Sequence, residues 1–299
     1  MTTAEEGAEG RLAPHQAYLQ GLAGALRAEL LKLDKRPAVW VLLGIALALL
    51  AVFTYLLNWL LFSHPPPGMN LPAGSEAKRA LYPQHMVSTA VSSGSLPSAL
   101  ALILGVLLIG SEYNWGTFKT LFTQRPGRMQ TLFAKLLAME IALGAGALLY
   151  FFTAAICSMI VAILDRQPLT MWPGGDTLIE GILASWLTWS WWAMFGAALA
   201  VAFRQSALAI GLGLAYSFVV EGLVFNLGGA FGGQFIRDVQ KFFPGPNASS
   251  LAESFAIGVP GTPSPHPLVG TGQACLVLIL YCVAAAVASS VLVANRDVD

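Results

Sequence analysis

The sequence predicts an all-α integral membrane protein with six transmembrane helices, an amphipathic helix before the first span and a short cytoplasmic helix between the second and third. Three observations support this prediction. The 299 residues are 56% hydrophobic and only 11% charged, whereas about 25% of the residues in a soluble domain are charged. Several apolar runs exceed the roughly 18 residues that indicate a membrane helix. Finally, Lys and Arg are distributed unevenly between the connecting segments.

Residues 1–37 form the predicted cytoplasmic N-terminus. They carry early acidic residues and no central apolar stretch, so they do not form a secretory signal peptide. In the second half of this segment, leucines recur at spacings of three and four, and we place the charged residues on the remaining faces. The pattern predicts an elbow helix that lies in the membrane interface and ends at Pro37. The alternative is a soluble helix packed on a partner. The leucines are Leu19, Leu22, Leu26, Leu30 and Leu33, and the charged residues are Arg27, Glu29, Lys32, Asp34 and Lys35.

Six spans are predicted within residues 38–294. A helix that crosses a hydrocarbon core of about 30 Å needs about 20 residues, and all six runs reach that length. The third is long enough to tilt or to project from the bilayer. To within a few residues the spans are Ala38–Phe62, Val91–Ser111, Leu136–Leu164, Leu178–Phe203, Ser206–Leu227 and Leu268–Ala294.

The distribution of Lys and Arg predicts the orientation of the chain. Of the 16 such residues, five lie on the side opposite the N-terminus, and the remainder lie on the N-terminal side. Because cytoplasmic loops carry the excess of these residues, both termini are predicted to be cytoplasmic, with residues 295–299 as the C-terminus. The outer loop 228–267 contains FIRDVQKFF, which we expect to form a short helix in, or dipping into, the outer interface. The five outer residues are Lys78, Arg79, Arg166, Arg237 and Lys241.

The segment EYNWGTFKTLFTQRPGR opens the cytoplasmic connection at residues 112–135. Trp115, Phe118 and Phe122 fall on one face at helical spacing, so Asn114–Gln124 reads as a short amphipathic helix that Pro126 and Gly127 end. Aromatic residues and Arg are enriched at protein interfaces. The segment is therefore either a membrane anchor or a surface held by another protein.

The order of residues in this connection resembles that of the membrane subunits of type 2 ATP-binding cassette (ABC) exporters. The shared pattern is Glu112, then Gly116-Thr117, Pro126, Arg128 and Lys135. The N-terminal helix, the six spans and the long last outer loop are also similar to this family. The resemblance implies that the cytoplasmic segment is a coupling helix docked in a separate ATPase subunit. It further implies a working unit of two permeases and two ATPases in the inner or plasma membrane.

The resemblance assigns roles to the coupling residues. Trp115, Phe118 and Phe122 would be docking rings, while Arg125 and Arg128 would face acidic groups of the ATPase. Glu112 would tie the turn together next to Gly116 and Thr117, although the family's pattern does not fix the positions of Phe122 and Arg125. The sequence itself contains no G-x-x-x-x-G-K-[ST] segment. We therefore expect no enzyme activity from this chain alone and no cofactor, with ATP bound by the partner.

Glu221, Trp189, Trp192 and Phe218 are the candidate residues of a substrate pathway. Glu221 is the deepest acid in any predicted span, where a charge is costly, so it should face protein or water. It either contacts cargo or makes a structural hydrogen bond. The tryptophans of SWLTWSWW lie near the midplane, where they could line a pocket for an apolar or cationic cargo or fill gaps between helices.

Other functions are less well supported by the residues. A balanced net charge predicts no nucleic-acid partner, and the scattered histidines and cysteines predict no metal site. An ion-coupled carrier could use Glu221 and Glu140 as a relay, but the sequence shows no inverted repeat, and neither acid has a second acid or a cation on its span. Glu140 and Glu180 are expected near span ends, within reach of the interface. A membrane anchor, scaffold or immunity protein for a soluble ATPase would also use a docking helix. The absence of a large soluble domain favours a small or amphiphilic cargo.

Overall fold

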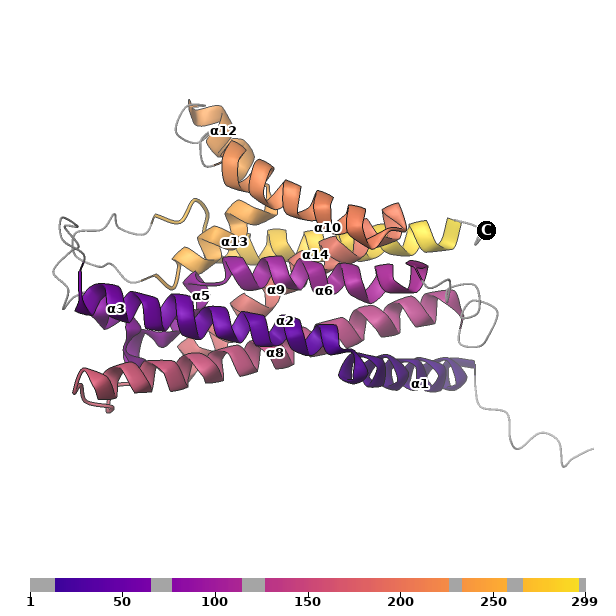
Figure 1. Ribbon diagram of the computed structural model, residues 1–299. Helices are drawn as coiled ribbons and strands as arrows, with labels where there is room; N and C mark the ends of the chain where they lie inside the picture. The colour runs from indigo at the N-terminus through magenta and orange to yellow at the C-terminus, as the bar shows by residue number, and fades with distance from the viewer. Residues whose placement is uncertain (1–13, 66–76, 115–126, 226–232, 257–265, 296–299) are drawn as a thin grey trace, which may run out of the picture.

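The computed structural model describes residues 14–65, 77–114, 127–225, 233–256 and 266–295, and every regular element in these ranges is a helix. The long helices form an elongated bundle (Figure 1). Helix α1 and the C-terminal end of α14 lie at the same end of the bundle, which we name the α1 end (Figure 1). The opposite end is named the far end.

The first span runs from Pro37 to Ser63 directly after α1 (Pro14–Lys35). Pro37 starts the new helix because proline is tolerated in a first turn but not inside a helix. The span comprises α2 (Pro37–Leu49), a π-helical section η1 (Leu50–Leu56) and α3 (Leu57–Ser63). The amide Nδ2 of Asn58 donates to the carbonyl oxygens of Phe53 and Thr54, at 3.1 and 2.8 Å. This side chain therefore gives two backbone carbonyls of the π-helical section a further donor.

The second span is bent, which the sequence analysis did not predict. The connection from the first span contains the short turns η2 (Arg79–Leu81) and η3 (Pro83–His85). Helix α5 (Met86–Ser92) then meets α6 (Ser95–Asn114) at an angle of 51°. The break at Ser93 and Gly94 has a local cause: Pro97 has no N–H to donate to the carbonyl of Ser93, four residues earlier. The predicted span Val91–Ser111 therefore contains a break near its outer end.

The remaining spans agree better with their predicted limits. Helix α8 (Arg128–Leu164) has 37 residues, about 55 Å at 1.5 Å per residue. It is longer than a bilayer core and starts eight residues before the predicted span. Helix α9 (Gly175–Phe203) and helix α14 (Thr271–Asn295) match their predicted spans within a few residues. The fifth span comprises α10 (Ser206–Ala215) and a π-helical section, η4 (Tyr216–Phe225).

The described part of the chain contains five helices that are long and apolar enough to cross a membrane. The bent α5–α6 pair makes a sixth when it is counted as one span. Large apolar side chains point outward along these helices, for example Leu148, Phe152 and Ile163, which are 58–64% exposed. A soluble protein rarely exposes apolar surface on this scale. The chain therefore folds as a multi-pass membrane protein.

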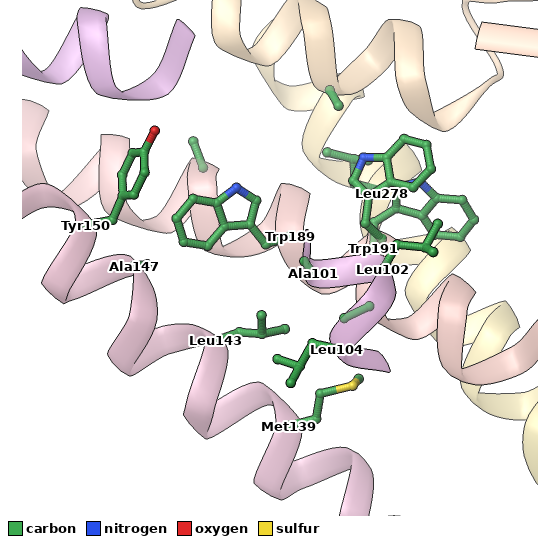
Figure 2. Close-up of a cluster of buried hydrophobic side chains, with 14 of the residues drawn as sticks. Ala101, Leu102, Leu104, Met139, Leu143, Ala147, Tyr150, Trp189, Trp191 and Leu278 are labelled. Carbon is green, nitrogen blue, oxygen red and sulfur yellow. The ribbon is translucent and has the colours of Figure 1, made fainter. Parts of the chain in front are cut away.

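Helices α6 and α9 approach each other closely in the middle of the bundle. A Cβ atom on Gly105 of α6 would overlap the carbonyl oxygen of Ala193, and one on Gly196 of α9 would overlap that of Leu102. Small residues permit such backbone contact between membrane helices. A cluster of buried side chains from α6, α8, α9 and α14 surrounds this contact (Figure 2).

The outer loop adds two short helices at the far end of the bundle. Helix α12 (Gly233–Gln240) confirms the predicted helix in FIRDVQKFF. Phe235 and Phe242, inside and just after it, are 77% and 70% exposed. Helix α13 (Pro244–Glu253) instead packs against α14 and η4. Within α13, Asn247 is fully buried and its Nδ2 donates to the carbonyl oxygens of Lys241 and Phe243. Asn247-Ala248-Ser249 matches the pattern of a glycosylation sequon, but its Asn247 is inaccessible in this fold.

Candidate functional site

A buried ion pair fastens α1 to the start of α8. The Nζ of Lys135 lies 2.7 Å from Oε2 of Glu29, and the two side chains are 2% and 5% exposed. The Nζ of Lys32 lies 2.6 Å from the other carboxylate oxygen, Oε1. The predicted polar position of Glu29 is therefore wrong: this residue shares the buried face of α1 with Leu33. A single-helix pattern places every charge outward because it does not contain the lysine of another helix.

The electrostatics of Glu29 follow from these contacts. Burial by itself raises the pKa of a carboxyl group, but the charge and hydrogen bond of Lys135, followed by those of Lys32, outweigh burial here. The pKa of Glu29 consequently lies below its ordinary value of 4.5. Glu29 is therefore ionised at neutral pH and makes a charge-assisted link between the two helices.

A second contact joins the end of α1 to α6. Nη1 of Arg36 donates to Oγ of Ser111, at 3.2 Å. Together, Glu29, Lys32, Arg36, Ser111 and Lys135 form what we call the α1 network. It holds α1 against the last turns of α6 and the first turns of α8. The connection 115–126 lies between these two helices in the sequence, so α1 and the residue that follows it are bonded to the helix on each side of that connection.

Most of the predicted coupling residues lie outside the described ranges. This holds for Trp115, Gly116, Thr117, Phe118, Phe122 and Arg125, and for most of the expected helix Asn114–Gln124. Glu112 lies in the last turn of α6, and Arg128 is the first residue of α8. Their docking roles stay predictions. Lys135 also belongs to the residue pattern on which the family resemblance rests, and the structure shows its contact with Glu29.

The four predicted pathway residues all line one cavity at the far half of the bundle. This far-end cavity has a volume of about 500 Å³ and is walled by α6, α9, η4 and α13. Trp189 and Trp192 come from α9, and Phe218 and Glu221 come from η4. Since η4 is π-helical, the cavity wall coincides with an irregular helix, a feature frequent at functional sites.

Glu221 also has a structural role. Its Oε1 accepts a hydrogen bond from the backbone N–H of Gly245, at 3.0 Å. Gly245 is in the first turn of α13, where backbone N–H groups lack helical acceptors and a negative charge is favoured. A Cβ atom at Gly245 would overlap the Glu221 carboxylate. Glu221 therefore makes the predicted structural hydrogen bond and also lines the cavity, while its contact with cargo stays a prediction.

The tryptophans of α9 divide into two groups. The Trp189 ring meets Tyr150 of α8 edge-on at a centroid distance of 5.2 Å (Figure 2), and the Trp192 ring lies 6.4 Å from that of Tyr216. The Trp191 ring stacks on that of Phe195 at a centroid distance of 5.2 Å and meets that of Tyr281 edge-on at 5.1 Å. The described residues that line the far-end cavity include Trp189 and Trp192 but not Trp191. Trp189 and Trp192 therefore both pack against neighbouring rings and line the cavity.

Glu140 forms two hydrogen bonds with α9. Its Oε2 accepts a hydrogen bond from Oγ of Ser190, at the middle of α9, and its backbone carbonyl accepts one from Trp186 Nε1. Because α8 starts at Arg128, Glu140 is about three turns inside the helix rather than near its end. The described lining of the far-end cavity does not include Glu140.

An ion-pair cluster at the far end was missed by the sequence analysis. Asp165 follows α8, and its carboxylate contacts Trp59 Nε1 at 3.1 Å, Tyr82 OH at 3.1 Å and Lys78 Nζ at 3.5 Å. Burial and the adjacent Asp165 raise the pKa of Tyr82 to about 12. These partners are 83–106 residues distant in the chain. No local pattern could have indicated the cluster.

Comparison with known proteins gives one clear relationship. A family model described as ABC-2 family transporter protein matches residues 25–220, which is more than half of the chain. The match includes α1 from its middle onward, the complete α1 network and three of the four predicted pathway residues. A search of the curated proteins finds no match.

Proposed function

We propose, since the chain belongs to the ABC-2 transporter family, that it is the membrane permease subunit of an ATP-driven exporter. In this proposal a separate ATPase subunit binds ATP, and the permease provides the path across the membrane for a small or amphiphilic substrate. A second permease copy completes the working unit. The α1 end faces the cytoplasm, as the excess of Lys and Arg on that side indicates.

The observation that carries this proposal is the α1 network. Glu29 of α1 is bonded to Lys135 of α8, and Arg36, directly after α1, is bonded to Ser111 of α6. In the sequence, α6 and α8 stand on either side of the proposed coupling segment. A displacement of that segment by an ATPase would therefore be transmitted to α1 and to two spans together. Because both ends of the Glu29–Lys135 pair are buried, separating them is costly, and the connection is stiff.

The far-end cavity favours a transporter over an anchor. A scaffold or immunity protein needs a docking surface but no internal space, whereas a volume of about 500 Å³ matches that of small-molecule sites. The cavity also counts against the alternative of an ion-coupled carrier that uses Glu221 and Glu140 as a relay. Glu221 lines it, while the carboxylate of Glu140 is bonded to Ser190, and the described cavity residues do not include Glu140. Among the described residues, therefore, the two acids do not line the same cavity.

Co-purification tests the proposed function. The chain is expressed with its genomic neighbours, and the proteins that purify with it are examined for a Walker A ATPase. The variant Phe118→Ala/Arg128→Ala removes a predicted docking ring and a predicted docking charge. The control variant Phe235→Ala/Arg237→Ala changes the same residue types on the exposed surface of α12 at the far end.

Under the proposal, an ATPase purifies with the wild-type chain and with the control, and the docking variant loses it. Retention of the ATPase by the docking variant would show that residues 112–128 do not hold the partner. Absence of any ATPase would favour the anchor interpretation of the segment.

A further inference from the structure

We propose that the far-end cavity binds an organic cation with an apolar body. This inference rests on the proposed transport function, because it names the class of substrate that the permease would carry. It is drawn from the charges, the rings and the size of the cavity.

Acidic side chains outnumber basic ones among the described residues that line the cavity. Glu221 and Glu253 are its carboxylates, and His266 is the other ionisable group among the described lining residues. Those residues include no Lys and no Arg. A cleft lined by one sign of charge between low-dielectric walls concentrates ligands of the opposite sign. The cavity therefore attracts cations and repels anions.

The Glu221 carboxylate is held in a fixed position. It accepts the N–H of Gly245 at 3.0 Å, and the close approach of Gly245 limits its movement. A fixed charge in a partly buried site interacts more strongly with a ligand than one on a mobile surface chain, because little ordering is needed when the ligand binds. Glu253, by contrast, is exposed at the end of α13. Glu221 is therefore the principal anionic group for a bound cation.

The remaining walls suit a ligand with an apolar body. Trp189, Trp192 and Phe218 supply three aromatic rings, and Phe218 is 65% exposed, so its ring is available for contact. Aromatic faces attract cations by about 0.5–2 kcal/mol and also cover apolar surface. Hydroxyl groups of Ser98, Ser185 and Thr188 add acceptors on the α6 and α9 sides. This combination recognises an amine or onium group attached to rings or chains.

Direct binding of a matched pair of ions tests the proposal. Tetraphenylphosphonium and tetraphenylborate have the same shape and opposite charge. The full chain is reconstituted in nanodiscs of uncharged lipid, and binding of each ion is measured by equilibrium dialysis, with empty nanodiscs subtracted. We expect saturable binding of the phosphonium ion and none of the borate ion.

Two variants locate the site. Glu221→Gln keeps an oxygen that accepts the Gly245 N–H but removes the charge, and we expect it to weaken phosphonium binding at least about tenfold. The matched control is Glu180→Gln, which changes an exposed acid of α9 that does not line the cavity. We expect no effect from it. Thr188→Trp fills the cavity without changing its charge, and we expect it to abolish phosphonium binding. This variant tests the site independently if Glu221→Gln does not fold.

The possible outcomes separate this inference from the proposed function. Equal binding of both ions, or phosphonium binding unchanged by Glu221→Gln and by Thr188→Trp, would overturn the cation site. That result would leave the permease assignment intact if an ATPase still co-purifies. Selective, Glu221-dependent binding without a co-purifying ATPase would support the site and count against the ATP-driven function.

Discussion

Lys135 and Glu29 form a buried ion pair, with Nζ and Oε2 2.7 Å apart, that fastens an N-terminal helix to the third span. Removing one of two charges that are both buried is costly, because the other loses its closest ionic partner in an environment without water. Helix α1 is thus an integral part of the bundle. This pairing also gives the Lys135 of the predicted family pattern a physical function, the anchoring of α1 beside the proposed coupling segment.

Removal of one member of the pair should destabilise the protein strongly. Lys135→Met leaves Glu29 buried with Lys32 as its remaining ionic partner, and we expect a loss of about 3–5 kcal/mol in the free energy of unfolding. Thermal unfolding in detergent measures the loss. The double variant Glu29→Leu/Lys135→Met, which removes both charges, should recover most of the stability. A Lys135→Met protein as stable as the wild type would contradict the buried pair.

The same pair predicts a dependence of stability on pH. The folded-state pKa of Glu29 is depressed below its ordinary value of 4.5, so the unfolded chain binds the proton more readily. The stabilisation from Glu29 is therefore fully present above about pH 4.5 and is lost as the pH falls through the lower folded-state pKa. Unfolding midpoints measured from pH 7 downward should show this loss. In Glu29→Gln the corresponding part of the pH dependence should disappear, and its persistence would exclude Glu29 as the cause.

The contact between α6 and α9 predicts a sharp difference between two glycines. Gly105→Ala places a methyl group onto the Ala193 carbonyl, so the helices must separate, and we expect a loss of at least about 2 kcal/mol. Gly211→Ala is the control, because no atom lies within 4 Å of its Cβ position in α10. Alanine favours the helix there by about 1 kcal/mol. Equal melting temperatures of the two variants would contradict the close approach.

The Asp165 cluster predicts a far-end contribution to stability. Asp165→Asn offers one oxygen in place of two to Trp59, Lys78 and Tyr82. We expect a loss of about 1–3 kcal/mol in unfolding free energy, the range for hydrogen bonds to a charged group. Asp238→Asn breaks an exposed pair with Lys241 and should change stability by less than about 1 kcal/mol. Comparable losses in the two variants would show that Asp165 is no more than a surface charge.

The sequence predicts those features of the fold that depend on local pattern. Apolar length locates the spans, and the leucine spacing locates α1. The bend before α6 is also local, because Pro97 causes it, yet hydropathy alone does not show it. Contacts that join distant segments could not be predicted. Glu29 looks like a surface charge until Lys135 is beside it, and the capping role of Glu221 depends on Gly245 of another helix.

The candidate site was predicted unevenly for the same reason. The rare acid and the aromatic rings of spans four and five indicated Glu221, Trp189, Trp192 and Phe218 individually, because polar or bulky groups deep in a span need a specific environment. That all four line one cavity follows from the packing of α9 against η4 and α13, which no single segment encodes.

ATP hydrolysis by the reconstituted complex tests the central claim most directly. The co-purified ATPase is assayed in nanodiscs with the wild-type chain, with Phe118→Ala/Arg128→Ala and with the far-end control Phe235→Ala/Arg237→Ala. The permease assignment predicts that the wild type and the control alter the ATPase rate equally. The docking variant should return the rate to that of the ATPase alone. A rate that is the same with and without the wild-type chain would contradict the assignment.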